Sequence, residues 1–232
     1  MIKFLDLKKI NAPYETAFQE KLKLVLENGW YILGNEVRVF ETNFANYCGA
    51  KYCVGVGNGL DALVLIFKGY IQLGKLQKGD EVIVPANAYI ASILAVLQAD
   101  LVPVLVEPKI ANYNIDSDLI QEKITSKTKA ILAVHLYGQL AEMGKINAIA
   151  AENNLIVVED AAQAHGVAKS VQLDAETQDT LSINKTTKAY SFYPGKNLGC
   201  LGDGGAVVTD DSELAKVIRS LRNYGSEVKY QN

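Results

Sequence analysis

One lysine in this chain has the surroundings that a reactive amine needs. Lys196 lies in the run SFYPGKNLG at residues 191–199, which proline and glycine interrupt too often for a regular strand or helix. The run follows a short strand-like segment and leads into GDGG at residues 202–205. A lysine on such a turn beside apolar residues can lose water, and the neutral amine then favoured is the form that makes an imine with an aldehyde. A turn lysine without a chemical role is the alternative that this run alone leaves open.

A phosphate site is predicted at the glycine turn GVGNGLDAL, residues 55–63, where a strand passes into a helix. Exposed amides and the helix dipole at such an N-terminus suit an anion. A dinucleotide fingerprint does not fit, because the third glycine of G-x-G-x-x-G should fall at Leu60, and the lysine of a P-loop is missing. A tight turn that binds nothing stays open.

Two further strand ends carry candidate ligand groups. Tyr89 follows an apolar strand and can present its ring to a flat ligand, although such a tyrosine more often belongs to the core. Glu159 and Asp160 end another apolar strand, where a carboxylate is costly to bury without a cationic or protonated partner. Strand alternation puts the two acids on opposite faces, which disfavours a paired-carboxylate glycosidase. Asp160 and His165 alone are weak evidence for a metal site, and we expect none.

Open α/β sheets bind ligands beyond the carboxyl ends of their strands. A phosphate turn, a ring-facing aromatic, a strand-end acid and a desolvated lysine are together the parts that pyridoxal 5′-phosphate requires. The lysine binds its aldehyde, and the acid keeps its pyridine nitrogen protonated so that the ring accepts electrons.

The chain resembles the DegT/DnrJ/EryC1/StrS family of pyridoxal-phosphate-dependent sugar aminotransferases, of fold type I. The resemblance extends from FLDL at residues 4–7 to LRNYG at 221–225, and its most specific parts are EDAAQAHG at 159–166 and SFYPGKNLG at 191–199. It implies that Lys196 is the Schiff-base lysine and that Asp160 pairs with the pyridinium nitrogen. His165 matches the family motif, but no catalytic role is assigned to it.

The remaining cofactor contacts also come from the resemblance. Gln163 is expected at the phenolic oxygen and Tyr89 on the ring. Ser191 is expected to bind the phosphate, together with the amides around Gly59, Leu60 and Asp61.

The resemblance further implies a nucleotide-linked keto sugar as substrate, glutamate as amino donor, and a homodimer with shared active sites. GNGLDAL at 57–63, VEP at 106–108 and YNID at 113–116 resemble enzymes that aminate C3 of dTDP-3-keto-6-deoxyhexoses, which belong to deoxyamino-sugar and surface-polysaccharide biosynthesis. A sugar dehydratase of the same family is disfavoured, because histidine replaces the lysine in those enzymes.

Two stretches depart from the family pattern. Residues 167–188 lack the usual shorter basic, glycine-containing turn, which leaves sugar specificity open. The sequence ends at Asn232, whereas family members continue into a C-terminal small domain. We therefore expect the large domain of such an enzyme; the alternative is a truncated, inactive large domain that acts as a binding or assembly module.

The strands and helices that must position these residues predict an α/β fold. Strands are predicted at residues 53–56, 81–84, 102–106, 130–135, 155–158, 189–192 and 206–209. Helices are predicted at residues 17–26, 35–47, 61–70, 90–98, 116–124, 143–153 and 212–223. Continuous apolar strands indicate a mostly parallel sheet flanked by helices in three α/β/α layers, the large-domain fold of fold type I transferases. We expect an N-terminal helical segment at 1–50 and a cofactor-binding domain at 51–232.

The helix at 212–223 carries apolar residues at helical spacing, so we expect part of its face to be exposed and to favour a dimer or larger species. The tail beyond Tyr224 is expected to be poorly ordered.

Composition narrows the class of protein. The 232 residues carry a net charge of −3 without a basic run, which disfavours nucleic acid as a partner. No apolar stretch is long enough to span a bilayer, and the charged N-terminus does not resemble a signal peptide. Three cysteines, Cys48, Cys53 and Cys200, fit reduced thiols, so we expect a cytoplasmic protein without a membrane partner.

Overall fold

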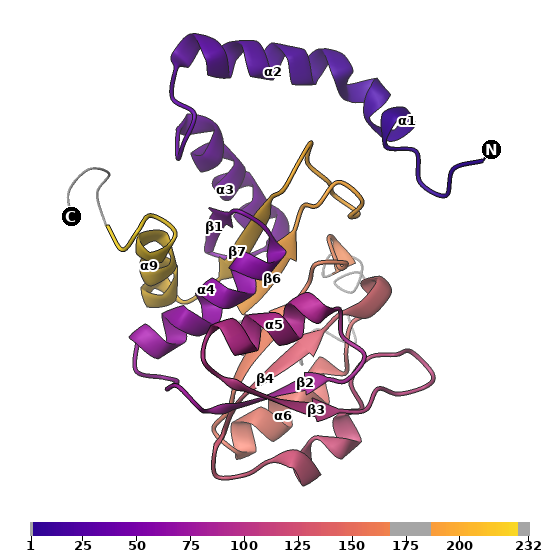
Figure 1. The fold of residues 1–232 in the computed structure, drawn as a ribbon, viewed down its shortest axis with the longest axis vertical. Coiled ribbons are helices and arrows are strands. Elements are labelled where there is room, and N and C mark those ends of the chain that lie inside the picture. Colours follow the sequence, from indigo (N-terminus) through magenta and orange to yellow (C-terminus); the bar gives the residue numbers. More distant parts are fainter. Residues whose placement is uncertain (1, 168–186, 227–232) are drawn as a thin grey trace.

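A computed structural model describes residues 2–167 and 187–226 of the chain (Figure 1). The predicted irregular segment at 167–188 and the predicted disordered tail therefore lie almost wholly outside the described residues. Within the described ranges no helix is both long and apolar enough to cross a membrane.

The core of the fold is a seven-stranded sheet in the order β1-β7-β6-β5-β4-β2-β3. Its strands are β1 (Tyr52–Val56), β2 (Glu81–Pro85), β3 (Val102–Val106), β4 (Thr128–Val134), β5 (Ile156–Asp160), β6 (Thr187–Ser191) and β7 (Gly205–Thr209). Only β7 pairs in antiparallel fashion, with β1 and β6. The other four pairings are parallel, as predicted. Six strands therefore present their carboxyl ends at one edge of the sheet, where β7 begins.

The described ranges contain the helices α1 (Leu7–Asn11), α2 (Glu15–Asn28), α3 (Asn35–Cys48), α4 (Gly59–Gln72), α5 (Ile90–Gln98), α6 (Met143–Glu152) and α9 (Ser212–Leu221). Of these, α3, α4, α5, α6 and α9 pack on the two faces of the sheet. The short 3-10 turns are η1 (Ala12–Tyr14), η2 (Ser117–Leu119), η3 (Gln121–Lys123) and η4 (Leu136–Gly138).

The alternation of strand side chains divides the core into two layers. Val82 and Val84 pack with α4, α5 and α9 on one face, whereas Ile83 between them packs with α6 on the other. Phe44 of α3 joins that second face through an aromatic cluster with Tyr190. The α/β/α layering predicted from the apolar strands is thus confirmed (Figure 1).

One local prediction was wrong: residues 116–124 form η2 and η3, two short 3-10 turns, rather than one α-helix. On α9, Leu214 and Ile218 are buried against α4 at Gly69, where a Cβ atom would lie 2.7 Å from Leu214 Cδ1, whereas Val217 and Leu221 stay partly exposed. The close approach of the two helices at a glycine supplies the partner surface that the pattern alone did not reveal.

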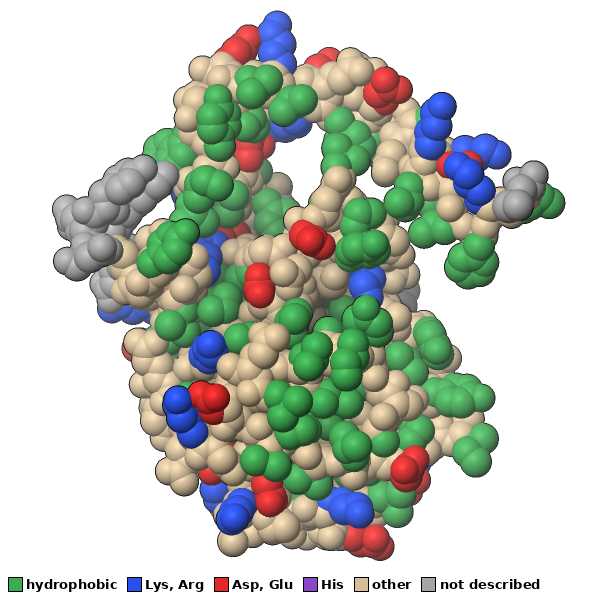
Figure 2. All heavy atoms as spheres, in the orientation of Figure 1, with side chains coloured by type: hydrophobic (Ala, Val, Ile, Leu, Met, Phe, Trp, Pro, Cys, Tyr) green, Lys and Arg blue, Asp and Glu red, His purple; other side chains and the backbone are tan. Residues whose placement is uncertain are grey.

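Exposed apolar side chains gather instead on an N-terminal arm formed by α1, η1 and α2. None of these three helices contains a buried residue. α2 runs across the top of Figure 1 away from the sheet, and Figure 2 shows open space between the arm and the body of the molecule. α3, in contrast, packs with its Phe44 and Ala45 in the core.

Candidate active site

A cavity of about 880 Å³ opens at the carboxyl edge of the sheet. Segments that follow β1, β2, β4, β5 and β6 all contribute to its lining. It collects the predicted site residues Gly59, Leu60, Tyr89, Asp160, Gln163, Ser191 and Lys196. Seven of the eight predicted residues thus meet in one place, although they span 138 positions of the chain from 59 to 196 when both ends are counted.

The first wall is the glycine turn after β1. Asn58 caps α4: its side-chain oxygen accepts the Asp61 amide at 2.8 Å. In the described part of the chain the amides of Gly59 and Leu60 have no acceptor, which leaves two donors and the positive end of the helix dipole for an anion.

Asp61 does not line this cavity, and its amide is already used by the cap. The expectation that its amide binds a phosphate is therefore not supported, because an Asn cap takes the donor at the third helical position.

Gly59 brings this turn against the end of β6. A Cβ atom on Gly59 would lie 2.7 Å from Cβ of Ser191, so only glycine allows the two segments to touch. Ser191 Oγ accepts a long bond of 3.4 Å from the Tyr193 amide, and its own hydroxyl proton remains free to donate. The two free amides and this hydroxyl form one cluster of neutral anion donors.

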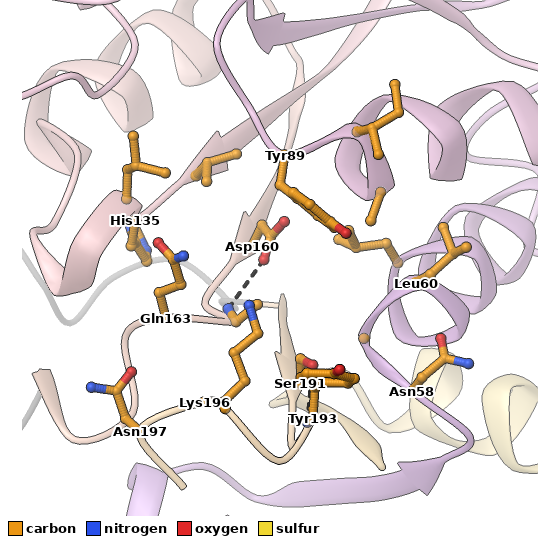
Figure 3. A pocket seen from close by; sticks show the side chains of 18 of the residues that line it. Asn58, Leu60, Tyr89, His135, Asp160, Gln163, Ser191, Tyr193, Lys196 and Asn197 are labelled. Atoms are coloured by element: carbon orange, nitrogen blue, oxygen red, sulfur yellow. Dashed lines mark hydrogen bonds between the residues drawn. The ribbon is translucent and has the colours of Figure 1, made fainter. Parts of the chain in front are cut away.

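Lys196 is held on a folded-back loop between β6 and β7. Its amide donates to the Tyr193 carbonyl at 2.8 Å, and Phe192 pairs with both Cys200 and Gly204 through its backbone at 2.8 Å. Gly199 lies so close to Pro194 that a side chain would not fit. The half-buried Lys196 side chain extends from this loop toward Asp160, between Gln163 and Tyr89 (Figure 3).

Asp160 ends β5 and is 7% exposed. Its Oδ1 accepts the Ala162 amide at 3.1 Å, and its Oδ2 accepts the hydroxyl of Ser92 at 2.7 Å. In the described ranges no lysine, arginine or histidine nitrogen lies within ion-pair distance of this carboxylate. The acid is held by two neutral donors and still carries lone pairs toward the cavity.

Glu159 points to the opposite face, as strand alternation predicted. Its Oε2 lies 2.7 Å from His135 Nε2 and 3.0 Å from Lys188 Nζ. His135 Nδ1 accepts the Ala141 amide at 3.3 Å, which assigns the ring proton to Nε2 as donor to Glu159. Burial alone would raise the pKa of Glu159, but the His135 hydrogen bond and the Lys188 charge more than offset it, so the pKa lies below its ordinary value.

Gln163 is oriented by the backbone of η4. Its Oε1 accepts the Tyr137 amide at 2.8 Å, and only the oxygen of a carboxamide can accept. Tyr137 adopts the left-handed conformation with φ of 55°, which turns that amide toward Gln163. The Gln163 NH2 group is thereby left to donate to a ligand in the cavity (Figure 3).

Tyr89 directly precedes α5 and is 72% exposed, so the alternative of a core tyrosine is excluded. Its ring stands over the cavity across from Lys196 (Figure 3). His165 lies under the site against the rings of Tyr190 and Phe192. Burial lowers the pKa of His165 to about 4, so the ring is neutral near pH 7. In the described part of the chain, neither ring nitrogen has a hydrogen-bond partner.

Sequence reasoning missed three residues that shape the site: Ser92, His135 and Tyr137. Ser92 is the one polar residue inside an otherwise apolar helix segment, IASILAVLQ, before its last position. His135 comes at the end of a buried strand, and Tyr137 precedes Gly138 in a turn. The sequence pattern could have singled out Ser92 and His135, but it could not show that they contact Asp160 and Glu159 of β5.

The arrangement suits a planar aromatic ligand with four different groups. The anion donors can bind a phosphate, and Asp160 can bind a protonated ring nitrogen. The Gln163 NH2 group can donate to an oxyanion on the ring. Lys196 supplies an amine for an aldehyde, and Tyr89 an aromatic face. No cluster of three or more potential metal ligands exists among the residues that the structure places.

Comparison with known proteins matches residues 14–232 to the model of the DegT/DnrJ/EryC1/StrS aminotransferase family. The chain is 56% identical to dTDP-3-amino-3,6-dideoxy-alpha-D-galactopyranose transaminase of Aneurinibacillus thermoaerophilus, over all of this chain and 61% of that protein. It is 46% identical to dTDP-3-amino-3,4,6-trideoxy-alpha-D-glucose transaminase of Streptomyces venezuelae, over all of this chain and 58% of that protein. It thus spans about three fifths of the length of these relatives.

Solved structures of aminotransferases also superpose on this chain. The crystal structure of S. venezuelae DesV with a ketimine intermediate superposes with a TM-score of 0.88 at 44% identity, over 99% of this chain and 59% of that one. NtdA of Bacillus subtilis with bound PMP superposes with a TM-score of 0.86 at 34% identity, over all of this chain and 50% of that one.

Proposed function

The chain belongs to the DegT/DnrJ/EryC1/StrS aminotransferase family, and from this premise we propose that it works as a pyridoxal 5′-phosphate-dependent aminotransferase of a nucleotide-linked keto sugar. One observation carries the proposal: Lys196, Asp160, Gln163, Tyr89 and Ser191, from three strand ends and a loop, line a single cavity. A chain that kept only the fold would not need these chemically different groups in one place.

Each group has a distinct part in holding the cofactor. The amides of Gly59 and Leu60, with the Ser191 hydroxyl, bind its phosphate. Asp160 binds the protonated ring nitrogen, and Gln163 donates to the ring oxygen. Bound in this way, pyridoxal 5′-phosphate supplies an aldehyde for amines and a ring that accepts electrons.

Lys196 acts through its Nζ atom. As an amine it would hold the aldehyde of the cofactor, and as a base it would carry the proton from the donor's α-carbon to the cofactor carbon that bore the aldehyde. Tyr89 covers one ring face and excludes water from it. His165 below the loop is neutral, so it adds no positive charge that would compete with the ring nitrogen for Asp160.

The substrate class follows from the relatives named above, which act on dTDP-linked 3-amino sugars. We therefore assign a dTDP-3-keto-6-deoxyhexose as acceptor and C3 as the carbon that receives the amino group, with glutamate as donor. The anion donors of the cavity are taken up by the cofactor phosphate, so the nucleotide diphosphate must bind outside this cluster.

A homodimer with shared active sites is part of the same proposal. The phosphate cluster consists of two backbone amides and one hydroxyl, and among the described residues the cavity is lined by no lysine or arginine other than Lys196, which is committed to the aldehyde. A second copy is the source that we propose for a further donor. The described part of the chain also leaves the apolar side chains of the arm uncovered, which favours association. We place the protein in the cytoplasm, where nucleotide sugars are made.

The experiment is cofactor capture. Purified protein incubated with pyridoxal 5′-phosphate should develop a visible absorption band, and borohydride reduction should attach the cofactor to the peptide that contains Lys196, as read by mass spectrometry. Lys196→Ala should lose both signals. Lys68→Ala, which removes an exposed lysine of α4, should retain both. A protein that takes up no cofactor, or carries it on another lysine, would contradict the proposal.

Activity is tested separately, by the conversion of glutamate to 2-oxoglutarate in the presence of a dTDP-keto sugar. The inactive-module alternative came from the missing small domain, and the relatives named above, which are transaminases, do not favour it. Turnover with glutamate and the keto sugar would rule that alternative out.

A further inference from the structure

We propose that Ser92 is a positioning residue: its hydroxyl fixes the Asp160 carboxylate in the orientation that receives the protonated ring nitrogen of the cofactor. This inference rests on the proposed function and concerns a residue outside the predicted site.

The first observation is that a buried serine hydroxyl in α5 is energetically unfavourable unless it forms a hydrogen bond. Ser92 is 0% exposed and lies in the first turn of α5, whose other residues up to Leu97 are apolar. A buried hydroxyl without a partner is unfavourable, and alanine would fill nearly the same space with better helix propensity. The hydroxyl is explained by one contact, the 2.7 Å hydrogen bond to Asp160 Oδ2.

The second observation is the charge that this contact stabilises. Asp160 is 7% exposed, and no cationic nitrogen of the described ranges comes within ion-pair distance of it. Its two oxygens accept from Ser92 and from the amide of Ala162, which can only donate. Two donors on two oxygens hold the carboxylate plane, while no cation that would balance a charge there lies within ion-pair distance in the described ranges. A protonated ring nitrogen is such a cation.

The third observation is that Tyr89 and Ser92 lie on the same helical turn. The Ser92 amide donates to the Tyr89 carbonyl at 2.9 Å, so the residue that covers the ring face and the residue that orients the acid at the ring edge are three positions apart and rigidly linked. A shift of the first turn of α5 moves both together.

The test compares two ligands that differ only at the ring nitrogen. Pyridoxal 5′-phosphate and its 1-deaza analogue, in which C–H replaces the nitrogen, are titrated against the full chain and followed by absorbance and tryptophan fluorescence. Ser92→Ala should weaken the binding of pyridoxal 5′-phosphate about tenfold, the size expected for losing a hydrogen bond to a charged group, and should change the binding of the analogue less than about twofold.

Two further variants make the result specific. Ser117→Ala removes another buried serine hydroxyl, which donates to Glu142 Oε2 at 2.6 Å away from the cavity, and should leave the ratio of the two affinities unchanged. In an Asp160→Asn background, adding Ser92→Ala should weaken the binding of pyridoxal 5′-phosphate no further, because the charge on which the hydroxyl acts is gone.

Ser92→Ala that weakens both ligands equally would overturn the inference and leave the proposed function standing, since the serine would then only support the fold. A wild-type protein that binds neither ligand, or both with equal affinity, would overturn the proposed function together with this inference.

Discussion

At the scale of single residues, the chemistry of the site depends on which atom of a side chain is left free. Gln163 illustrates this, because the Tyr137 amide occupies its oxygen and leaves its NH2 group to the cavity. His165 illustrates the reverse: neither of its nitrogens has a partner in the described part of the chain, and burial keeps the ring neutral.

Gln163→Glu should weaken the binding of pyridoxal 5′-phosphate by tenfold or more, about 1.4 kcal/mol, because a carboxylate accepts from Tyr137 but presents charge instead of a donor to the ring oxygen. Gln163→Ala removes the donor without adding charge and should weaken binding less. Absorbance titration gives both affinities. Equal losses in the two variants would show that the donor does not face the ring.

The pKa of about 4 for His165 predicts a pH-dependent stability. Between the unfolded value of about 6.5 and the folded value, the unfolded chain binds a proton that the folded chain does not, so stability falls as the pH drops through this window. His165→Phe should flatten that part of the pH profile. Urea midpoints measured from pH 7 to 4.5 check this, and parallel profiles of wild type and variant would contradict it.

At the scale of elements, the site is assembled where strand ends approach one another. The turn before α4 reaches the end of β6 only because Gly59 has no side chain. His135 after β4, Glu159 of β5 and the partly buried Lys188 of β6 link the three strands through their side chains.

Gly59→Ala should destabilise the protein by about 1–3 kcal/mol and weaken cofactor binding, since its Cβ atom would lie 2.7 Å from Ser191 Cβ and force α4 away from β6. Gly144→Ala in α6 is the matched control, because its Cβ atom would meet nothing within 4 Å, and it should be neutral or stabilising by up to about 1 kcal/mol. Urea unfolding measures both. Indistinguishable effects would refute the tight contact.

Glu159→Gln should lower the free energy of unfolding by about 1–3 kcal/mol at pH 7, because it leaves the partly buried Lys188 without its carboxylate. The folded pKa of Glu159 lies below its unfolded value, so this contribution is complete above about pH 4.3 and is lost as the pH falls through the folded pKa. Lys145→Ala, in an exposed ion pair, should change stability by less than about 1 kcal/mol. A loss that persists unchanged in acid would exclude the ion pair as its cause.

At the scale of the whole molecule, the structure divides into a closed three-layer body and an arm. The body buries its apolar strands and helices, whereas the arm exposes Leu22 and Leu26 of α2 by 59% and 57%. Figure 2 shows hydrophobic side chains along this arm, and open space separates much of the arm from the body in this view.

Leu22→Glu together with Leu26→Glu should shift the protein toward monomer, because charge on a face buried between two copies is unfavourable. Gln19→Glu, at a polar position of the same helix, should leave the assembly unchanged. Sedimentation velocity at micromolar concentration reads the change. A wild-type protein that is monomeric would remove the basis for shared active sites.

The sequence alone predicted the strands and most of the helices and, through the family resemblance, most of the residues that line the cavity. Apolar strands, glycine turns and the run around Lys196 are local signals, because strand and helix periods and turn conformations depend on neighbours a few positions away. The parallel sheet followed from the same runs, and with it the expectation that Asp160 and Lys196 meet at one edge.

Only the tertiary structure decided how these residues are supported. Ser92 and Asp160 are 68 positions apart, and Ser191 meets Gly59 across the sheet. The partner of α9 and the partner of Glu159 likewise come from distant segments. Such contacts depend on strand order and register, which local patterns do not encode because each strand could pair with several others at similar local energy.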